Sequence, residues 1–174
     1  AHCATGQGRG GDAQRAEGYL RQICDLGPRP SGSAAMTKQQ ELLVDFFTKA
    51  GAVVELQPFT ARHPETGDAV QMNNVIARWF PDRPDRYLLC AHYDTRPYPD
   101  RDPDDPKGRF VGANDGASGV AAMMELSHHM STLPENVGVD MVLFDGEELV
   151  YIDRRDTYFL GSTHFAQQYA AKRQ

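Results

Sequence analysis

The chain has 174 residues, of which 40% are hydrophobic, 18 are basic and 24 are acidic, a composition typical of one globular domain. No apolar run approaches the roughly 18 residues that a membrane span needs, and a net charge of -6 without a basic patch argues against nucleic acid as a partner. Three widely spaced cysteines predict neither a disulfide scaffold nor a metal–cysteine cluster. We expect one domain over residues 1–174, with a flexible Gly-rich tail at residues 1–11.

Two amphipathic helices are predicted in the first third of the chain. Apolar residues repeat at helical spacing from Ala16 to Ile23, and a second apolar face runs from Leu42 to Ala50. The hydroxyl residues that end the turn-rich segment 26–33 suit the N-terminal cap of the second helix. The glycine after Ala50 stands where a left-handed C-terminal cap is usual.

The middle of the chain changes to the pattern of short strands. Residues 53–59, 74–80 and 87–92 are runs rich in β-branched or aromatic side chains, separated by polar turns. The last run is almost continuously apolar, which is typical of a strand buried on both faces. Prolines and aspartates then crowd the segment between Arg96 and Arg109, which predicts an irregular surface loop, with a lid over a site as the alternative.

Helix and strand alternate in the last third. Residues 115–130 predict a helix, residues 137–144 a strand and residues 161–173 a closing helix. This alternation predicts an α/β domain with a largely parallel sheet, in which functional groups gather where the strands end.

Three polar clusters stand at such places. His92 and Asp94 follow an apolar strand, Asp115 opens a helix, and Glu147 and Glu148 follow the next strand. One imidazole among carboxylates suits a divalent cation, most commonly zinc when sulfur is absent. In an extended segment Asp94 can hold the far nitrogen of His92. Both glutamates reach one site if the backbone turns at the glycine before them, so that one can bind metal while the other moves protons.

Each cluster alone has a plainer structural interpretation. A lone His-x-Asp is most often a structural hydrogen bond, a Glu-Glu pair a solvated chain end, and Asn-Asp-Gly a turn or cap. Together, in this order along the chain, they indicate one site. His128 and His129 follow Asp115 on the same predicted helix at about 20 Å, too far to share an ion with it.

These motifs, together with the Leu26–Ser33 segment and Gly161-Ser162, resemble the zinc exopeptidases of the M28 aminopeptidase type and, within them, the glutaminyl-peptide cyclotransferases. The His-x-Asp, Gly-Ala-x-Asp and Glu-Glu motifs belong to the whole superfamily. The polar insert between the glutamates and Gly161 looks more like the cyclotransferases. The resemblance implies a three-layer α/β/α domain with a central, mostly parallel, mixed sheet that here lacks its C-terminal part.

The resemblance also implies roles for single residues. Asp115 and Glu148 would bind zinc, and His92 would bind a second zinc in an aminopeptidase-like site or stay beside a one-zinc site. In a cyclotransferase Glu147 would move a proton from the α-amine of an N-terminal glutamine to departing ammonia, which leaves pyroglutamate. In an aminopeptidase Glu147 would activate a water to cleave the first peptide bond.

Further expectations follow from the same resemblance. The substrate would be a peptide or protein N-terminus, the protein would be extracytoplasmic or secreted, and the Asp94–Thr95 peptide bond would be cis. Two features depart from the family: residues 149–153 lack a tryptophan that the cyclotransferases carry, and a further metal-binding histidine and an aspartate would lie beyond Gln174. Strand 137–144 would then have unpaired edges. A non-catalytic fragment or binding module is therefore a third alternative.

Overall fold

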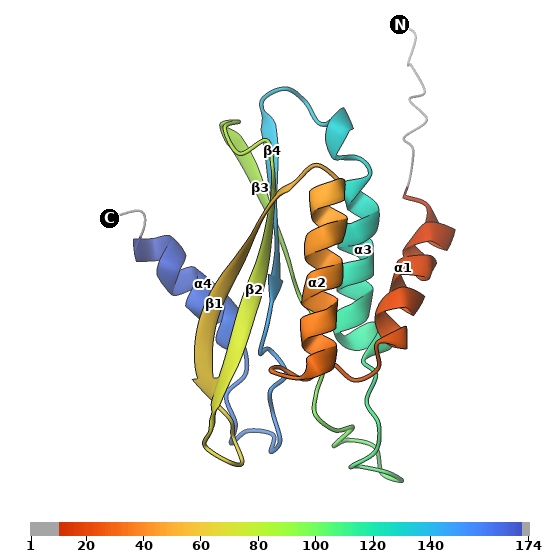
Figure 1. Ribbon diagram of the computed structural model, residues 1–174, viewed down its shortest axis with the longest axis vertical. Coiled ribbons are helices and arrows are strands. Elements are labelled where there is room, and N and C mark those ends of the chain that lie inside the picture. The colour runs from red at the N-terminus through yellow and green to blue at the C-terminus, as the bar shows by residue number, and fades with distance from the viewer. Residues whose placement is uncertain (1–10, 172–174) are drawn as a thin grey trace, which may run out of the picture.

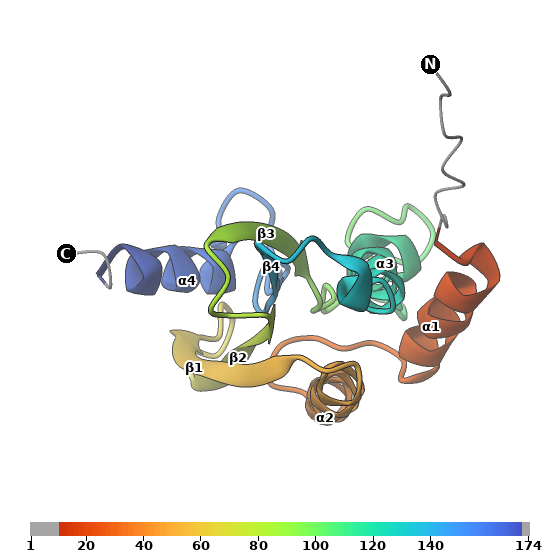
Figure 2. The ribbon, with the colours of Figure 1, turned by 90° about the horizontal axis from the view of Figure 1, so that it is seen from above.

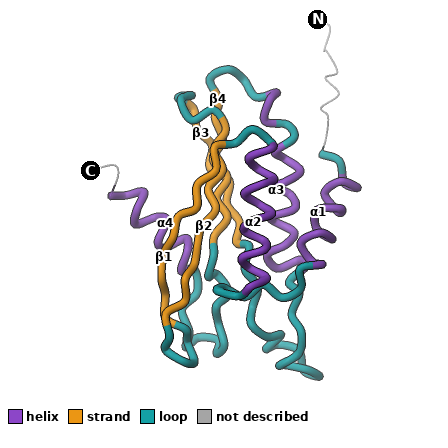
Figure 3. The backbone as a smooth tube through the Cα atoms, viewed as in Figure 1, coloured by secondary structure: helices purple, strands orange, loops and turns teal. Residues whose placement is uncertain are grey.

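The structure is a computed structural model that describes residues 11–171. Helices lie on both sides of one sheet (Figures 1 and 3). The helices are α1 (Ala13–Asp25), α2 (Ala34–Lys49), α3 (Ser118–Ser127) and α4 (Leu160–Ala171), and the strands are β1 (Val53–Arg62), β2 (Ala69–Trp79), β3 (Asp85–His92) and β4 (Val137–Phe144). Apart from Gly11, the expected tail at residues 1–11 lies outside the described residues.

The sheet separates two unequal helical layers. Figure 2 shows α2 and α3 on one face, with α1 outside α3, and α4 on the opposite face. The main core lies between the sheet and the layer of α2 and α3. Its fully buried members include Leu43 and Phe47 from α2, Val120 and Met124 from α3, and Val75, Met141 and Leu143 from the sheet. The α/β fold expected from the alternation of helices and strands is confirmed.

The strand order is β1-β2-β4-β3, and the sheet is mixed. β1 and β2 form an antiparallel hairpin, β2 and β4 are antiparallel, and β3 and β4 are parallel. Parallel pairs are therefore not the majority among the described strands. For β1 and β2 the reason is the short turn at residues 63–68, where His63 donates its N–H to the carbonyl of Asp68 at 2.8 Å. Such a turn reverses the chain, whereas a parallel pair needs a long crossover.

β3 lies at an edge of this sheet, which corrects two expectations. Tyr87 is 61% exposed and Leu88 is 51% exposed, so the strand over residues 87–92 is not buried on both faces. The strand over residues 137–144 is paired on both sides, with β2 and with β3, and its edges are not open. An apolar run does not tell an edge strand from a central strand, because strand order depends on long-range pairing rather than on local composition.

The helix ends explain how the chain approaches the sheet. The hydroxyl of Ser33 accepts a hydrogen bond from the N–H of Met36 at 3.1 Å, and Gly51 has φ +87°, so both predicted caps of α2 are confirmed. α3 begins later than expected and ends at Ser127. Before it, residues 113–117 form a π-type turn in which Asp115 leaves the helical conformation. This turn, rather than the helix itself, carries Asp115.

None of the helices among residues 11–171 is long and apolar enough to cross a bilayer. Within the same residues, Cys24 and Cys90 form no disulfide. Cys3 lies outside the part of the chain that the structure describes.

Candidate active site

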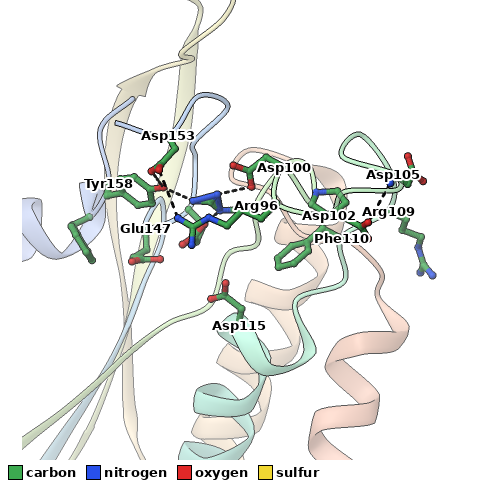
Figure 4. A pocket seen from close by; sticks show the side chains of 15 residues that line it. Arg96, Asp100, Asp102, Asp105, Arg109, Phe110, Asp115, Glu147, Asp153 and Tyr158 are labelled. Carbon is green, nitrogen blue, oxygen red and sulfur yellow. Dashed lines mark hydrogen bonds and ion pairs between the residues drawn. The ribbon is translucent and has the colours of Figure 1, made fainter. Parts of the chain in front are cut away.

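The three polar clusters meet at one end of the sheet. β3 and β4 run parallel with His92 opposite Phe144, so both strands release the chain at the same place. The turn before α3 reaches the same region, and Asp115, Glu147 and Glu148 line a pocket of about 710 Å³ (Figure 4). The three motifs, which are far apart in the sequence, therefore lie close together in the fold.

The imidazole of His92 lies at the centre of the cluster. Its Nε2 lies 3.1 Å from Oδ1 of Asp115, and its Nδ1 lies 3.6 Å from Oε2 of Glu147. Burial alone would lower the pKa of His92, but Asp94, Glu147 and Asp115 outweigh burial and raise this pKa to about 9. The three carboxylates together therefore favour the charged form of this imidazole.

Asp94 is fully buried and holds the backbone of both glutamates. Its Oδ1 accepts a hydrogen bond from the N–H of Glu147 at 3.2 Å, and its Oδ2 accepts one from the N–H of Glu148 at 2.8 Å. Oδ1 also lies 3.4 Å from Nδ1 of His92, but that nitrogen has no hydrogen-bond partner. The contact between Asp94 and His92 is therefore electrostatic. The hydrogen bonds of Asp94 to the backbone of the two glutamates were not predicted from the spacing of the residues.

A left-handed turn brings the glutamates to the pocket. Gly146 has φ +70°, which confirms the turn expected before Glu147. The preceding Asp145 is fully buried and accepts hydrogen bonds from the hydroxyl of Ser31 at 2.6 Å and the N–H of Asn73 at 3.1 Å. Burial and the charge of Asp94 raise the pKa of Asp145. The turn is thus fixed to two other segments of the chain.

Glu148 pairs with a cation that the sequence analysis did not single out. Nε of Arg96 donates to Oε2 of Glu148, and both side chains are mostly buried. Burial raises the pKa of Glu148, Arg96 lowers it, and Glu147 and Asp115 raise it again, so that the net shift is upward. One signal could have pointed to Arg96: it follows the His-x-Asp motif by two residues and precedes an aspartate-rich loop.

The donor types suit zinc, although their present arrangement does not assemble a complete ligand set. The imidazole of His92 and the carboxylates of Asp115 and Glu148 are ligand types that zinc accepts, and the buried Nδ1 of His92 lacks a partner. Among residues 11–171, however, no three His, Cys, Asp or Glu side chains converge in a group that could hold a metal ion. The roles of the five predicted site residues therefore stay predictions.

The other histidines of the described chain lie away from this cluster. Nε2 of His128 lies 2.6 Å from the hydroxyl of Tyr19, beyond the far end of α3. The ring of His164 stacks on Phe59. His129 lies 3.6 Å from Glu125. None of these three lines the pocket that Asp115 and the two glutamates line.

The backbone after Asp94 is trans, which corrects the expected cis peptide bond to Thr95. In this trans arrangement the N–H of Thr95 donates to the carbonyl of Arg29 at 3.1 Å, and the N–H of Arg29 donates to the Thr95 hydroxyl at 2.9 Å. These reciprocal hydrogen bonds fix the chain where it leaves His92 and Asp94.

Two irregular segments wall the pocket, and we call them the acidic loop (residues 97–109) and the insert (residues 149–159). The acidic loop contains neither helix nor strand and lines one side. The aromatic lining residues are Phe110, Tyr158 and Phe159. Residues 149–153, which lack the expected tryptophan, contain Tyr151. The hydroxyl oxygen of Tyr151 lies 2.8 Å from Nε2 of His63, and Tyr151 does not line the pocket. Two of the three aromatic lining residues therefore come from the far end of the insert, and Phe110 directly follows the acidic loop.

Strand ends that gather an imidazole and carboxylates beside one pocket define an α/β domain of the enzyme type. Residues 74–174 match the sequence model of peptidase family M28, and the chain belongs to this family.

Relatives support this assignment. The chain is 48% identical to Fimbriiglobus ruber glutaminyl cyclase, with a TM-score of 0.88 over 93% of this chain and 56% of that one. A Zn-dependent exopeptidase from Parabacteroides distasonis is 30% identical, with a TM-score of 0.79 over 89% and 55%. The glutaminyl-peptide cyclotransferase-like protein of Mus musculus is 31% identical over 90% of this chain and 41% of its own length. The chain thus spans about half the length of these relatives.

Proposed function

We propose that the chain carries the proton-transfer and metal-binding residues of a zinc-dependent glutaminyl-peptide cyclotransferase. The observation that carries the proposal is the position of Glu147, whose carboxylate faces the imidazole of His92 at 3.6 Å in a pocket that also contains Glu148 and Asp115. The similarity to Fimbriiglobus ruber glutaminyl cyclase supports this reaction over others of the family.

Asp115, Glu148 and His92 are the residues that would hold zinc, one ion in a cyclotransferase and two in an aminopeptidase. When bound, zinc would supply polarisation of the substrate carbonyl. The chain itself supplies the fixed geometry: Asp94 holds the backbone of Glu148, and the turn at residues 113–117 presents Asp115.

Glu147 is the proposed proton carrier. The α-amine nitrogen of an N-terminal glutamine forms a bond to the side-chain amide carbon, and the bond from that carbon to the amide nitrogen breaks. Glu147 takes the proton from the attacking amine and delivers it to the departing nitrogen, so the products are a pyroglutamyl peptide and ammonia. The Glu147 side chain is partly exposed to the pocket, which allows this contact with substrate.

The substrate would be a peptide or protein with a free N-terminus. Carboxylates from the acidic loop and from the site line the pocket, and the positive charge of a peptide amine suits such a lining. The aromatic wall of Phe110, Tyr158 and Phe159 offers apolar surface for the aliphatic part of the side chain.

An M28 aminopeptidase is the second candidate, and the Zn-dependent exopeptidase among the structural neighbours favours it. Glu147 would then take a proton from the water that attacks the first peptide carbonyl. The missing tryptophan in residues 149–153 also weakens the case for glutamine specificity. A non-catalytic binding module is the third candidate.

One assay separates the three. The protein is incubated with zinc and a peptide that begins with glutamine, and the products are analysed by mass spectrometry and an ammonia assay. Ammonia with a mass loss of about 17 Da supports the cyclotransferase, a free amino acid supports the aminopeptidase, and no product supports the binding module.

A variant pair tests the role of Glu147. Glu147→Gln should abolish either activity and leave zinc content unchanged, because the amide cannot accept a proton. Glu135→Gln removes an exposed carboxylate outside the pocket and should leave activity unchanged. Full activity of Glu147→Gln would contradict the proposal.

A further inference from the structure

Arg96 joins three segments that otherwise meet only at the pocket. Its side chain is only 8% exposed, and each guanidinium nitrogen has its own acceptor. Nε donates to Oε2 of Glu148, Nη1 donates to Oδ1 of Asp100 at 2.6 Å, and Nη2 donates to the hydroxyl of Tyr158 (Figure 4). One cation therefore contacts a predicted metal ligand, the acidic loop and the insert at once.

The contact on the insert continues into a chain of hydrogen bonds. The Tyr158 hydroxyl donates to Oδ1 of Asp153 at 2.9 Å, and the guanidinium carbon of Arg96 lies 5.5 Å from the centre of the Tyr158 ring. The backbone before Arg96 is fixed by the reciprocal hydrogen bonds of Thr95 with Arg29. Arg96 thus projects from an anchored point toward two segments without regular structure.

We infer that Arg96 is a positioning residue that orients Glu148 toward the metal and couples both pocket walls to that carboxylate. By holding Oε2 of Glu148, Arg96 leaves Oε1 for a metal ion. Because the same guanidinium holds Asp100 and Tyr158, the acidic loop and the insert are fixed relative to Glu148 rather than independently. The metal part of this inference rests on the proposed function, whereas the coupling of the two walls does not.

Two other roles fit the geometry less well. A surface ion pair would be solvent-exposed and worth little, but the Arg96 and Glu148 side chains are both mostly buried. A substrate-binding cation would point free donors into the pocket, whereas the three nitrogens of Arg96 are all engaged by the protein. Arginine also differs from lysine here, because its donors are spread over three nitrogens that each meet a different acceptor, whereas an ammonium offers its three N–H groups from a single nitrogen.

The test uses the full chain with Arg96→Met, Arg96→Lys and the control Arg109→Met. Arg109 lines the same pocket and has the same charge, but no hydrogen bond or ion pair links its side chain to Glu148. Two quantities are measured: hydrogen exchange of residues 97–109 and 149–159 in the metal-free protein, and the zinc dissociation constant by competition with a chromophoric chelator. Thermal melting confirms that each variant is folded.

In Arg96→Met we expect zinc binding weakened by about 10- to 100-fold and faster exchange in both segments. In Arg96→Lys the ammonium can still meet Glu148 but not all three acceptors, so zinc binding should return to within about threefold while exchange stays fast. Arg109→Met should change neither quantity. The separation of the two readouts in the lysine variant is what a merely structural role would not produce.

Unchanged or tighter zinc binding in Arg96→Met overturns the orienting role, because Arg96 would then compete with the metal for Glu148. Unchanged exchange in both segments overturns the coupling. If Arg96→Met does not fold, the lysine variant decides: protected segments there overturn the coupling, and fast exchange with retained zinc binding supports the inference. If the unaltered chain binds no zinc, the proposed metal site fails, and exchange in the metal-free variants still decides the coupling.

Discussion

Oδ2 of Asp94 accepts a 2.8 Å hydrogen bond from the backbone N–H of Glu148, and both groups are buried. The same carboxylate accepts a second backbone hydrogen bond from the N–H of Glu147. The end of β3 thereby fixes the main chain that follows β4, independently of where the glutamate side chains point.

We predict that Asp94→Asn destabilises the protein. An asparagine keeps one acceptor but turns an NH₂ group toward one of the two backbone N–H groups, so one buried hydrogen bond to a charge is lost. The free energy of unfolding should fall by about 2–3 kcal/mol, measured by urea denaturation. Asp104→Asn, a matched change at an exposed residue of the acidic loop, should alter it by less than about 0.5 kcal/mol. Equal stability of the two variants would contradict the anchoring role of Asp94.

The start of α1 is tied to α3 through Glu125, which makes stability depend on pH. Arg15 donates two hydrogen bonds of 2.6 Å to Glu125, and the N–H of Asp12 donates a third at 2.8 Å. Led by the hydrogen bonds from Arg15, which outweigh burial, these contacts lower the pKa of Glu125 to about 2. Because this pKa is below its ordinary value of 4.5, the stabilisation is complete above about pH 4.5 and is lost as the pH falls toward 2.

We therefore expect Glu125→Gln to be less stable than the unaltered protein by about 1–2 kcal/mol at pH 6, with a difference that shrinks between pH 4.5 and 2. The value is below what the full change in pKa implies, because Arg15 is 38% exposed. Urea denaturation across this range measures it. Glu17→Gln breaks an exposed pair with Arg21 and serves as the control, with little change at any pH. A gap that stays constant with pH would show that Glu125 acts through packing alone.

Two glycine-to-alanine changes should have opposite signs. A Cβ at Gly161 would lie 2.3 Å from the carbonyl oxygen of Asp145 and 2.4 Å from Oδ1 of Asn74, so Gly161→Ala must displace α4 or the strand ends. We expect a loss of about 2–3 kcal/mol. Gly18 lies within α1 with nothing within 4 Å of its added Cβ, so Gly18→Ala should stabilise by about 0.5–1 kcal/mol. Thermal or urea unfolding checks both, and a stable Gly161→Ala would show that α4 tolerates a shift.

Local patterns predicted much of this fold. β4 has the predicted bounds, and the caps at Ser33 and Gly51 lie where their residue types place them, because these features depend on neighbours within a few residues. The edge position of β3 was not predicted, since periodicity says nothing about which strands pair across the sheet.

The candidate site shows the same division. Residue types and their positions at strand ends predicted that His92, Asp115 and Glu147 would lie close together, and both carboxylates lie within 3.6 Å of the His92 imidazole. Arg96 was missed because Glu148 and Tyr158 lie 52 and 62 residues away from it along the chain. A buried cation of this kind is recognised only after the fold has placed its acceptors around it.

The exposed edge strand should limit solubility. Leu88 is half-exposed on β3, and the outer edge of that strand has no partner strand among the described residues. We expect Leu88→Lys to raise the concentration at which light scattering begins by about threefold, because a charge on an edge strand opposes pairing between chains. Ser131→Lys adds the same charge at an exposed residue outside β3 and should leave the onset unchanged. The same onset in both variants would point to another self-association surface.

β3 also ends at His92. Among the described strands β3 pairs with β4 alone, and His92 lies opposite Phe144 in that parallel pair. Edge strands open locally at lower free energy than strands paired on both sides. The imidazole at the centre of the candidate site therefore shares the local unfolding equilibrium of the outermost strand. Any strand that pairs with β3 would reduce the fraction of molecules in which His92 is displaced, and would do so without contacting the pocket.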